Sequence, residues 1–298
     1  MDKEIEVFSV NNLSTQIRKK KILKNVSFKG NTSQIIGLVG ANGSGKTTIM
    51  KSILGLIKFS GEIEISKINI LFNNHPILSR VGSLIEEPGI YPFLTGREHL
   101  QCFSILKGKE AQSDINEIID QLKLTTFIDE KASSYSLGMK QKLAIAIALL
   151  NKPILVILDE PMNGLDIQSI HDLRDIIINK KNQGVTFVIS SHLLSELEKV
   201  ADQLVIIKDG KSILNLPFKT FKKKEIFCLI TDQKDKLFKT LKFNNIPYSK
   251  NETIINILLD ESDEKQFLNL IKENNIKLKK FIKKDTKDLE DRFLQFIY

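Results

Sequence analysis

The sequence predicts an α/β fold in two parts, a larger domain over residues 1–215 and a small α+β domain over residues 216–298. In the larger part, short apolar runs at 34–39, 154–158 and 185–190 alternate with segments of helical periodicity. Runs that are apolar at every position are typical of parallel strands buried on both faces. We therefore expect a mainly parallel sheet enclosed by helices.

Length and composition indicate a globular protein without a membrane-spanning segment. The chain has 298 residues, of which 42% are hydrophobic and 27% charged. Its longest uninterrupted apolar run, at 143–150, is far shorter than the ~20 residues that a spanning helix needs. The charged N-terminus lacks the apolar stretch of a secretory signal. These features predict a cytoplasmic protein that reaches the inner face of a membrane only as a peripheral subunit.

Charge and cysteine content argue against two further classes of protein. The net charge is +8, but residues 1–210 carry 25 Lys and Arg against 23 Asp and Glu, whereas residues 211–298 carry 19 against 13. The larger part is almost neutral, which speaks against nucleic acid as its partner. Cys102 and Cys228 are far apart and form no CxxC pair, so neither a disulfide framework nor a cysteine zinc site is expected.

The residues after the run at 34–39 match the phosphate-loop pattern G-x-x-x-x-G-K-[ST] in a strand, loop and helix context. Glycines let consecutive backbone N–H groups face a phosphate, and the following helix adds its positive N-terminal end. Lys46 is expected to reach the β- and γ-phosphates of ATP, and Thr47 to ligate Mg²⁺. A chance glycine-rich turn is the alternative. The predicted nucleotide-binding residues of this segment are Gly40, Ala41, Asn42, Gly43, Ser44, Gly45, Lys46, Thr47 and Thr48.

Two adjacent carboxylates follow the apolar run at 154–158. Asp159 is expected to hold Mg²⁺ through a water molecule, and Glu160 to act as the general base for the attacking water. An apolar strand that ends in Asp-Glu is also a common surface feature. The pattern becomes specific because it follows a phosphate loop in the same chain.

Ser136 and Gly138 stand just before a strongly apolar helical segment. A serine hydroxyl and exposed N–H groups at a helix start form either a second phosphate receptor or an ordinary helix cap. The stretch Ser136-Leu-Gly-Met-Lys-Gln resembles the signature motif of ABC-type ATPases, with leucine where glycine is commoner. The residues ending at Asp166 resemble the D-loop of that family, and those ending at His192 resemble its switch histidine.

The resemblance extends over residues 5–210 and implies an ABC-type nucleotide-binding domain, a P-loop NTPase with a RecA-like core and a helical subdomain. It implies that His192 senses the γ-phosphate, although a lone histidine at a strand end is more often a surface residue. It also implies that Ser136, Gly138 and Asp166 serve a nucleotide held across a dimer. The working unit is then expected to be a homodimer that closes on two ATP molecules and joins separate integral-membrane permease subunits.

Glu86 stands where the family pattern has glutamine. A carboxylate there can accept but not donate hydrogen bonds and adds negative charge beside Mg²⁺ and the γ-phosphate, so the change is either neutral or alters catalysis and metal binding. The stretch 84–98 nevertheless resembles a subgroup that carries this glutamate, the ATPase subunits of exporters that protect bacteria against lantibiotics and bacitracin-like peptides. The resemblance implies that Tyr91, Phe93 and Leu94 contact the membrane subunit, unless they simply pack the domain.

Ile17 is a second departure from the family pattern. The family places an aromatic ring at this position, where it stacks on adenine. An aliphatic side chain covers the base without the stacking contribution. We therefore expect Ile17 to contact the base and nucleotide binding to be weaker or less base-selective.

The last third follows a connector expected at 211–225, which contains Pro217 and three consecutive lysines. The elements expected after it are a strand near 226–231, a helix near 233–243, a strand near 253–259, a helix near 262–274, a basic strand near 277–283 and a helix from about 286. In the last helix, Leu289, Phe293 and Ile297 share a face that should pack on the preceding strands. The basic run at 277–284 is either a lysine-guarded sheet edge or a contact with anionic lipid.

Together these observations predict an ATP-hydrolysing subunit that powers export of a lantibiotic or similar peptide antibiotic. An exporter of another cargo, such as a drug, an ion or a lipid, has the same ATPase motifs and is the first alternative. A soluble ABC-type ATPase acting on nucleic acid is the second. It is disfavoured because the chain has one cassette and no long coiled coil between its motifs.

Overall fold

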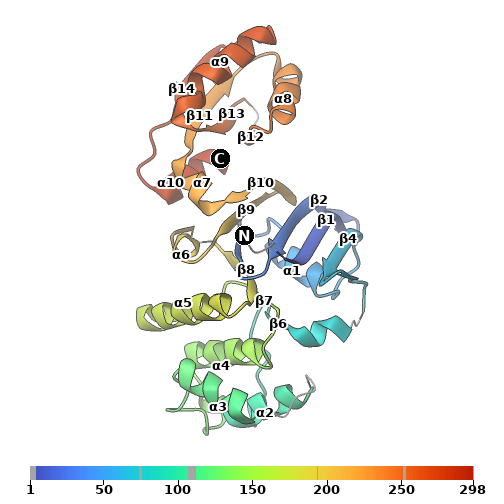
Figure 1. The fold of residues 1–298 in the computed structure, drawn as a ribbon, viewed down its shortest axis with the longest axis vertical. Coiled ribbons are helices and arrows are strands. Elements are labelled where there is room, and N and C mark those ends of the chain that lie inside the picture. Colours follow the sequence, from blue (N-terminus) through green and yellow to red (C-terminus); the bar gives the residue numbers. More distant parts are fainter. Residues whose placement is uncertain (1–4, 74–75, 107–111, 193, 251–252, 298) are drawn as a thin grey trace.

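A computed structural model of the chain describes residues 5–73, 76–106, 112–192, 194–250 and 253–297. The elements are stacked in layers along one axis (Figure 1). Two sheets form the middle, a helical layer from residues 96–149 lies at one end, and a domain from residues 225–283 lies at the other. No helix in the described part of the chain is long and apolar enough to span a membrane.

The central sheet has six strands, and it is parallel except for one edge strand. In spatial order these are β10 (Lys211–Pro217), β9 (Gln203–Lys208), β3 (Ile35–Val39), β8 (Thr186–Ser191), β7 (Leu155–Leu158) and β6 (Val81–Leu84). Every residue of β3, β7 and β8 is buried, as their largely apolar sequences predict. The prediction of a parallel sheet buried on both faces is confirmed.

A second, antiparallel sheet and one helix cover the first face of the central sheet. The strands, in spatial order, are β2 (Lys20–Asn31), β1 (Glu6–Ile17), β4 (Ser60–Ile65) and β5 (Ile68–Asn69). The helix α1 (Lys46–Ile53) contributes Ile49, Met50 and Ile53 to a buried cluster that also holds residues of β1, β2, β3 and β9. The helix that follows the phosphate loop is thereby fixed between the two sheets.

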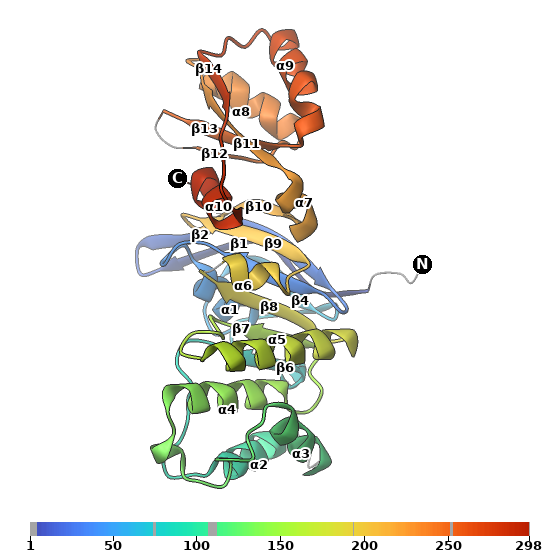
Figure 2. The ribbon, with the colours of Figure 1, turned by 90° about the vertical axis from the view of Figure 1, so that its left-hand side faces the viewer.

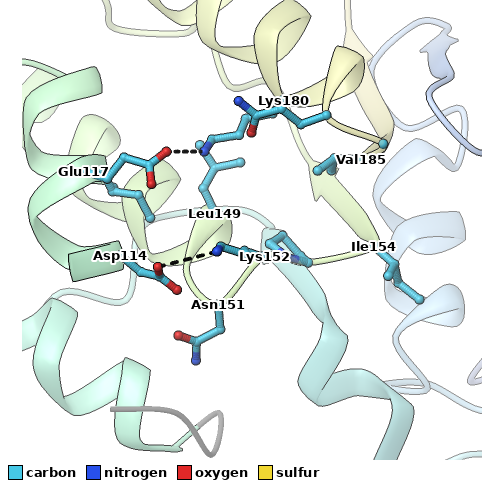
Figure 3. Close-up of a pocket in the computed structure, with 12 residues that line it drawn as sticks. Asp114, Glu117, Leu149, Asn151, Lys152, Ile154, Lys180 and Val185 are labelled. Atoms are coloured by element: carbon cyan, nitrogen blue, oxygen red, sulfur yellow. Dashed lines mark hydrogen bonds and ion pairs between the residues drawn. The ribbon is translucent and has the colours of Figure 1, made fainter. Parts of the chain in front are cut away.

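Helices cover the opposite face. These are α5 (Ile167–Asn182) beside the sheet, and beyond it α2 (Gly96–Leu106), α3 (Gln112–Gln121) and α4 (Leu137–Leu149). The apolar helix α4 approaches β6 closely, because a Cβ at Gly82 would lie 1.8 Å from the carbonyl oxygen of Ala148. Ion pairs connect α3 to the core, from Glu117 to Lys180 at 3.3 Å and from Asp114 to Lys152 at 3.8 Å (Figure 3).

The C-terminal domain has the order β-α-β-β-α-β. Its elements are β11 (Glu225–Ile230), α8 (Lys234–Phe243), β12 (Tyr248–Lys250), β13 (Ile255–Leu259), α9 (Glu264–Glu273) and β14 (Lys280–Lys283). The strands form an antiparallel sheet in the order β12-β13-β11-β14, a ferredoxin-like arrangement. The predicted elements are confirmed, and β12 is an additional strand. The basic run forms β14 at an edge of this sheet.

One face of the C-terminal sheet packs against the ATPase domain. Residues Ile226 and Leu258 of the sheet join one buried cluster with Leu204 and Ile206 of β9. Between them lie α10 (Leu289–Ile297), through Phe293 and Phe296, and α7 (Phe218–Lys223), through Phe218 and Phe221. Figure 2 shows α10 between the C-terminal sheet and the sheets of the ATPase domain. The predicted packing of Leu289 and Phe293 is confirmed, and the side chain of Ile297 lies outside the described residues.

The expected connector at 211–225 is wrong, since this segment is folded. Residues up to Pro217 form β10, and α7 follows at once with Phe218 and Phe221 fully buried. The six residues of α7 include only two apolar ones, Phe218 and Phe221, which are too few for a helical pattern to show in the sequence. The predicted boundary between residues 215 and 216 falls inside β10.

Candidate nucleotide-binding and catalytic site

The phosphate loop connects β3 to α1, as the sequence pattern predicts. Gly43 and Gly45 have φ values of +77° and +113°, a backbone region that favours glycine. A Cβ at Gly40 would lie 2.3 Å from the carbonyl oxygen of Ile207, so the loop also passes close to β9. The glycines therefore permit the tight curl that turns backbone N–H groups toward an anion.

Lys46 is buried within this loop. Its Nζ donates to the carbonyl oxygen of Gly40 at 2.7 Å and lies 3.7 Å from Oε1 of Glu160. A buried ammonium group needs such partners, and loop carbonyls together with one carboxylate supply them. The lysine is thus held at the mouth of the loop, where a phosphate group would be its strongest partner.

The hydroxyl of Ser44 indicates that the loop suits a phosphate. Its Oγ is buried and has no hydrogen-bond partner within the described part of the chain. The backbone of Ser44 is fully engaged, because its N–H donates to Ala41 and its carbonyl oxygen accepts from Gly210. A buried hydroxyl without a partner costs free energy, which a phosphate oxygen would offset.

Thr47 and Asp159 meet although 112 residues separate them. The Thr47 hydroxyl donates to Oδ2 of Asp159 at 2.7 Å, and the Ser190 hydroxyl donates to Oδ1 at 2.5 Å. These residues come from α1 and from the carboxyl ends of the neighbouring strands β7 and β8. A hydroxyl and one carboxylate are hard oxygen donors of the kind that Mg²⁺ uses together with phosphate and water. The residues present therefore fit a nucleotide-bound Mg²⁺.

Glu160 and His192 form the second contact across the strand ends. The Nδ1 of His192 lies 2.8 Å from Oε2 of Glu160, and the His192 backbone N–H donates to the same oxygen at 3.2 Å. The backbone N–H of Glu160 donates to Ser190 Oγ at 2.8 Å, at a φ of +47°. Ser190 therefore connects both acidic residues, and the structure brings Lys46, Asp159, Glu160 and His192 together as one site.

Glu86 forms an ion pair that the sequence analysis did not anticipate. Its Oε1 accepts from Nζ of Lys51 at 2.6 Å. Lys51 lies one helical turn after Thr47 on α1, so the pair sits on the same face as the Thr47 hydroxyl. Glu86 also has a positive φ of +62°, which marks a sharp change of chain direction after β6. The charge of the extra carboxylate is matched by a neighbouring ammonium.

The signature segment lies in a different layer from the phosphate loop, with α4 among the helices and α1 between the sheets (Figure 1). Ser136 caps α4, since its Oγ accepts from the backbone N–H of Met139 at 3.3 Å. A Cβ at Gly138 would lie 3.3 Å from the carbonyl oxygen of Gly164, so the signature abuts the D-loop. Asp166 caps α5 by accepting from the N–H of Ser169 at 2.9 Å. The hydrogen bonds from Ser169 lower the pKa of Asp166.

The remaining predicted positions are at the surface. Ile17 ends β1 with 47% of its side chain exposed. Tyr91 and Phe93 are 52% and 66% exposed, whereas Leu94 is half-buried. Their loop is held in shape by the buried His99, whose Nε2 accepts from the Tyr91 N–H at 2.9 Å. Tyr91 and Phe93 are therefore presented by a fixed loop and not packed into the core.

The parallel sheet, the phosphate loop, the two carboxylates at the end of β7 and the separate helical layer define a P-loop ATPase of the ABC class. The chain matches the family described as ABC transporter over residues 23–163. It belongs to this family as an ATP-binding subunit that hydrolyses ATP. Members of the family bind nucleotide, work with membrane permeases and form dimers.

Three known proteins show the similarity in detail. The bacitracin transport ATP-binding protein BcrA of Bacillus licheniformis is 39% identical over 220 residues, 73% of this chain and 72% of that protein. The lantibiotic transport ATP-binding protein SrtF of Streptococcus pyogenes is 39% identical over 213 residues, 70% of this chain and 90% of that protein. A solved structure of an ATP-binding subunit of an ABC transporter is 28% identical with a TM-score of 0.67, covering 72% of this chain and 92% of that one.

Two residues of the site were not predicted from the sequence. Ser190 bridges the two acidic residues, and Lys51 pairs with Glu86. Each has a signal that could have found it. Ser190 ends a strand next to the strand that delivers Asp159, and parallel neighbours bring their carboxyl ends together. Lys51 follows Thr47 by four residues on a helix, which places both on one face.

Proposed function

We propose that this chain is the ATP-hydrolysing subunit of an exporter that protects the cell against a lantibiotic or a similar peptide antibiotic. The similarity to a bacitracin and a lantibiotic transport ATP-binding protein supports this cargo. The observation that carries the enzymatic part is the convergence of Lys46, Thr47, Asp159, Glu160 and His192 at one edge of the central sheet.

We assign the roles in the site from these contacts. The backbone of residues 40–48 and Lys46 bind the β- and γ-phosphates of ATP. Thr47 and Asp159 hold Mg²⁺, with Glu86 next to this shell. A Mg²⁺ ion held by these residues would supply positive charge to offset the charge that develops on the phosphate oxygens.

Glu160 is the general base that accepts a proton from the attacking water. A water molecule attacks the γ-phosphorus, the bond from this phosphorus to the β,γ-bridging oxygen breaks, and Glu160 accepts a proton from the water. His192 lies against Oε2 of Glu160 and positions it. We expect the same imidazole to contact the γ-phosphate of bound ATP. The products are ADP and inorganic phosphate.

The site needs a second copy of the chain for completion. Ser136 and Gly138 stand at the positive N-terminal end of α4, which lies in another layer from α1. In a homodimer arranged head to tail, this helix end and Asp166 of one copy meet the nucleotide held by the other. Ile17 covers the base from the side of the phosphate loop.

The exposed pair Tyr91 and Phe93 forms the surface for the permease subunits. Their rings lie 5.8 Å apart on the loop that precedes α2, and a rigid aromatic pair is typical of an interface anchor. We place the protein on the inner face of the cell membrane, attached through these subunits. Replacing both residues with serine should preserve the ATPase activity of the isolated subunit and abolish its association with the permease.

Resistance in a sensitive host tests the function. The chain is expressed with the membrane subunits encoded beside it, and growth is scored against a lantibiotic, bacitracin and unrelated drugs. The matched control is Glu160→Gln, which should bind ATP and dimerise but not turn over. Resistance to the peptides that is lost in Glu160→Gln supports the proposal. Resistance to unrelated drugs alone would overturn the peptide cargo, and unchanged hydrolysis in Glu160→Gln would overturn the assignment of the base.

A further inference from the structure

A basic hollow lies where the C-terminal domain meets the ATPase domain. We call it the interdomain cleft, and its volume is about 580 Å³, within the size range of small-molecule sites. The ATPase domain contributes Lys24 from β2 and Lys208 and Lys211 from either side of the β9–β10 turn. The C-terminal domain contributes Lys242 from α8 and Lys250 from β12. Five lysines from four strands and a helix therefore converge on one hollow.

The charge of this cleft is poorly balanced. Among the described residues that line it, Asp209 is the one acidic residue and stands against five lysines. Lys24, Lys211 and Lys242 form no ion pair within the described residues, and Lys250 lies over the ring of Phe238 at 4.9 Å. An anion bound in the cleft would supply these ammonium groups with a partner of opposite charge.

The pocket between α3 and the core shows the opposite arrangement (Figure 3). Its two lysines, Lys152 and Lys180, face Asp114 and Glu117, with which they form ion pairs. In this pocket, therefore, each lysine has an acidic partner. The excess charge of the interdomain cleft is a local feature and not a general result of the high lysine content.

One wall of the cleft is apolar and rigid. It is formed by Leu241, Ile246, Pro247 and Tyr248. The Tyr248 ring stacks on Phe238 with centroids 5.3 Å apart, and burial raises its pKa. A ligand that carries several negative charges on a compact group can bind the lysines, and this wall excludes water from one side.

The cleft is joined to the phosphate loop by a single turn. The N–H of Gly210 donates to the carbonyl oxygen of Ser44 at 3.0 Å, and the carbonyl oxygen of Gly210 accepts from the N–H of Lys24 at 2.7 Å. A Cβ at Gly210 would lie 1.8 Å from the carbonyl oxygen of Ile22, so the turn passes directly against the backbone that precedes Lys24. Lys208, Asp209 and Lys211 flank this turn and line the cleft.

We propose that the interdomain cleft binds a small anion with a chain of phosphates, at a site distinct from the phosphate loop. Bound there, the anion holds the C-terminal domain against the ATPase domain and fixes the turn that supports Ser44. The loop of Tyr91 and Phe93 precedes α2, at the far end of the molecule from this cleft (Figure 1). Under the proposed function this loop contacts the permease, so the cleft lies away from the membrane. A dissolved ligand is therefore favoured over a lipid headgroup.

Lysine acetylation followed by mass spectrometry tests the site directly. Inorganic tripolyphosphate is the probe, and modification rates are compared with and without it in the full chain. Lys24, Lys211, Lys242 and Lys250 should react several-fold more slowly with the probe present. Lys239 and Lys265, which are exposed on α8 and α9 outside the cleft, should be unaffected. Equal protection of all lysines, or protection at Lys46 alone, would overturn the proposal.

Titration calorimetry with matched variants provides the second readout. Wild type should bind tripolyphosphate at two sites, one of them the phosphate loop. Lys242→Gln with Lys250→Gln should weaken the second site by about tenfold, as expected for two charge-assisted contacts, and leave the first unchanged. Lys239→Gln with Lys265→Gln removes the same charge and should change neither. Binding of phosphatidylglycerol vesicles that depends on Lys242 and Lys250, without a second tripolyphosphate site, would point to lipid and contradict the proposal.

Discussion

The hydroxyl of Ser195 donates to Oε1 of Glu290 at 2.7 Å, and this bond joins α6 (Leu194–Glu198) of the ATPase domain to α10 of the C-terminal domain. The helix α6 begins two residues after His192. A second link to the same helix is the ion pair between Glu198 and Lys222 of α7 at 2.7 Å. The helices α10 and α7 thus hold in place the helix that follows His192.

Replacing Ser195 with alanine should loosen this contact and lower the turnover number more than the affinity for ATP. A hydrogen bond to a carboxylate contributes about 1.5–3 kcal/mol to stability. Only part of this free energy acts on the position of His192 and so on the activation barrier. We therefore expect kcat to fall by about threefold to tenfold. Steady-state ATPase kinetics measure it. The control is Ser262→Ala, at an exposed serine of the C-terminal domain. A lowered melting temperature with unchanged kcat would show that the bond only stabilises the fold.

The pair formed by Lys51 and Glu86 predicts a dependence on Mg²⁺. In Lys51→Gln the carboxylate loses its partner and the site becomes more negative, so ATP should bind more weakly while less Mg²⁺ is needed for half-maximal activity. Because the pair is largely exposed, the KM for ATP should rise by no more than about fivefold. The double variant with Glu86→Gln should recover most of this loss, as a double-mutant cycle would show. Purely additive effects would contradict a functional pair.

An aromatic ring at position 17 should strengthen nucleotide binding. Ile17→Tyr adds a stacking surface at the exposed end of β1, and such contacts contribute about 0.5–1.5 kcal/mol, or about twofold to tenfold in affinity. Titrations with ATP and GTP measure the gain and any preference between bases. Ile5→Tyr, at an exposed isoleucine before β1, is the control. An unchanged affinity in Ile17→Tyr would exclude residue 17 from the base contact.

Acid should destabilise the start of α5 through Asp166. Its pKa is lowered by the hydrogen bonds from the Ser169 hydroxyl and backbone N–H, so the folded state favours the ionised carboxyl. The stabilisation is present above the ordinary pKa of an aspartate and is lost as the pH falls through the lower pKa of the folded state. Unfolding free energies of wild type and Asp166→Asn should therefore converge below about pH 4. A difference that stays constant down to pH 3 would contradict this origin.

Much of the fold follows from local patterns in the sequence. The largely apolar runs identified β3, β7 and β8 because strands buried on both faces are rich in apolar residues. The glycine pattern of the phosphate loop identified the curl at Gly43 and Gly45, since few other residues adopt that backbone conformation. The connector failed because α7 has only six residues, too few for a helical period to show.

The side-chain contacts of the site could not be predicted in the same way. The sequence named Thr47, Asp159, Glu160 and His192, but nothing in their spacing shows that Ser190 bonds to both acidic residues. The pairing of Glu86 with Lys51 depends on the turn at Glu86. This residue has a positive φ, which the local sequence does not predict. Such contacts arise from the packing of distant segments and need three-dimensional structure.

The position of α10 has a consequence for the order in which the protein is made. This helix covers Phe218, Phe221, Ile226 and Leu258, all of which leave the ribosome earlier than Phe293 and Phe296 do. Until α10 has been synthesised, this hydrophobic surface of the nascent chain is exposed to water and to neighbouring chains. The surface is buried only after α10 has been synthesised, and the bond from Ser195 of α6 to Glu290 also forms only then.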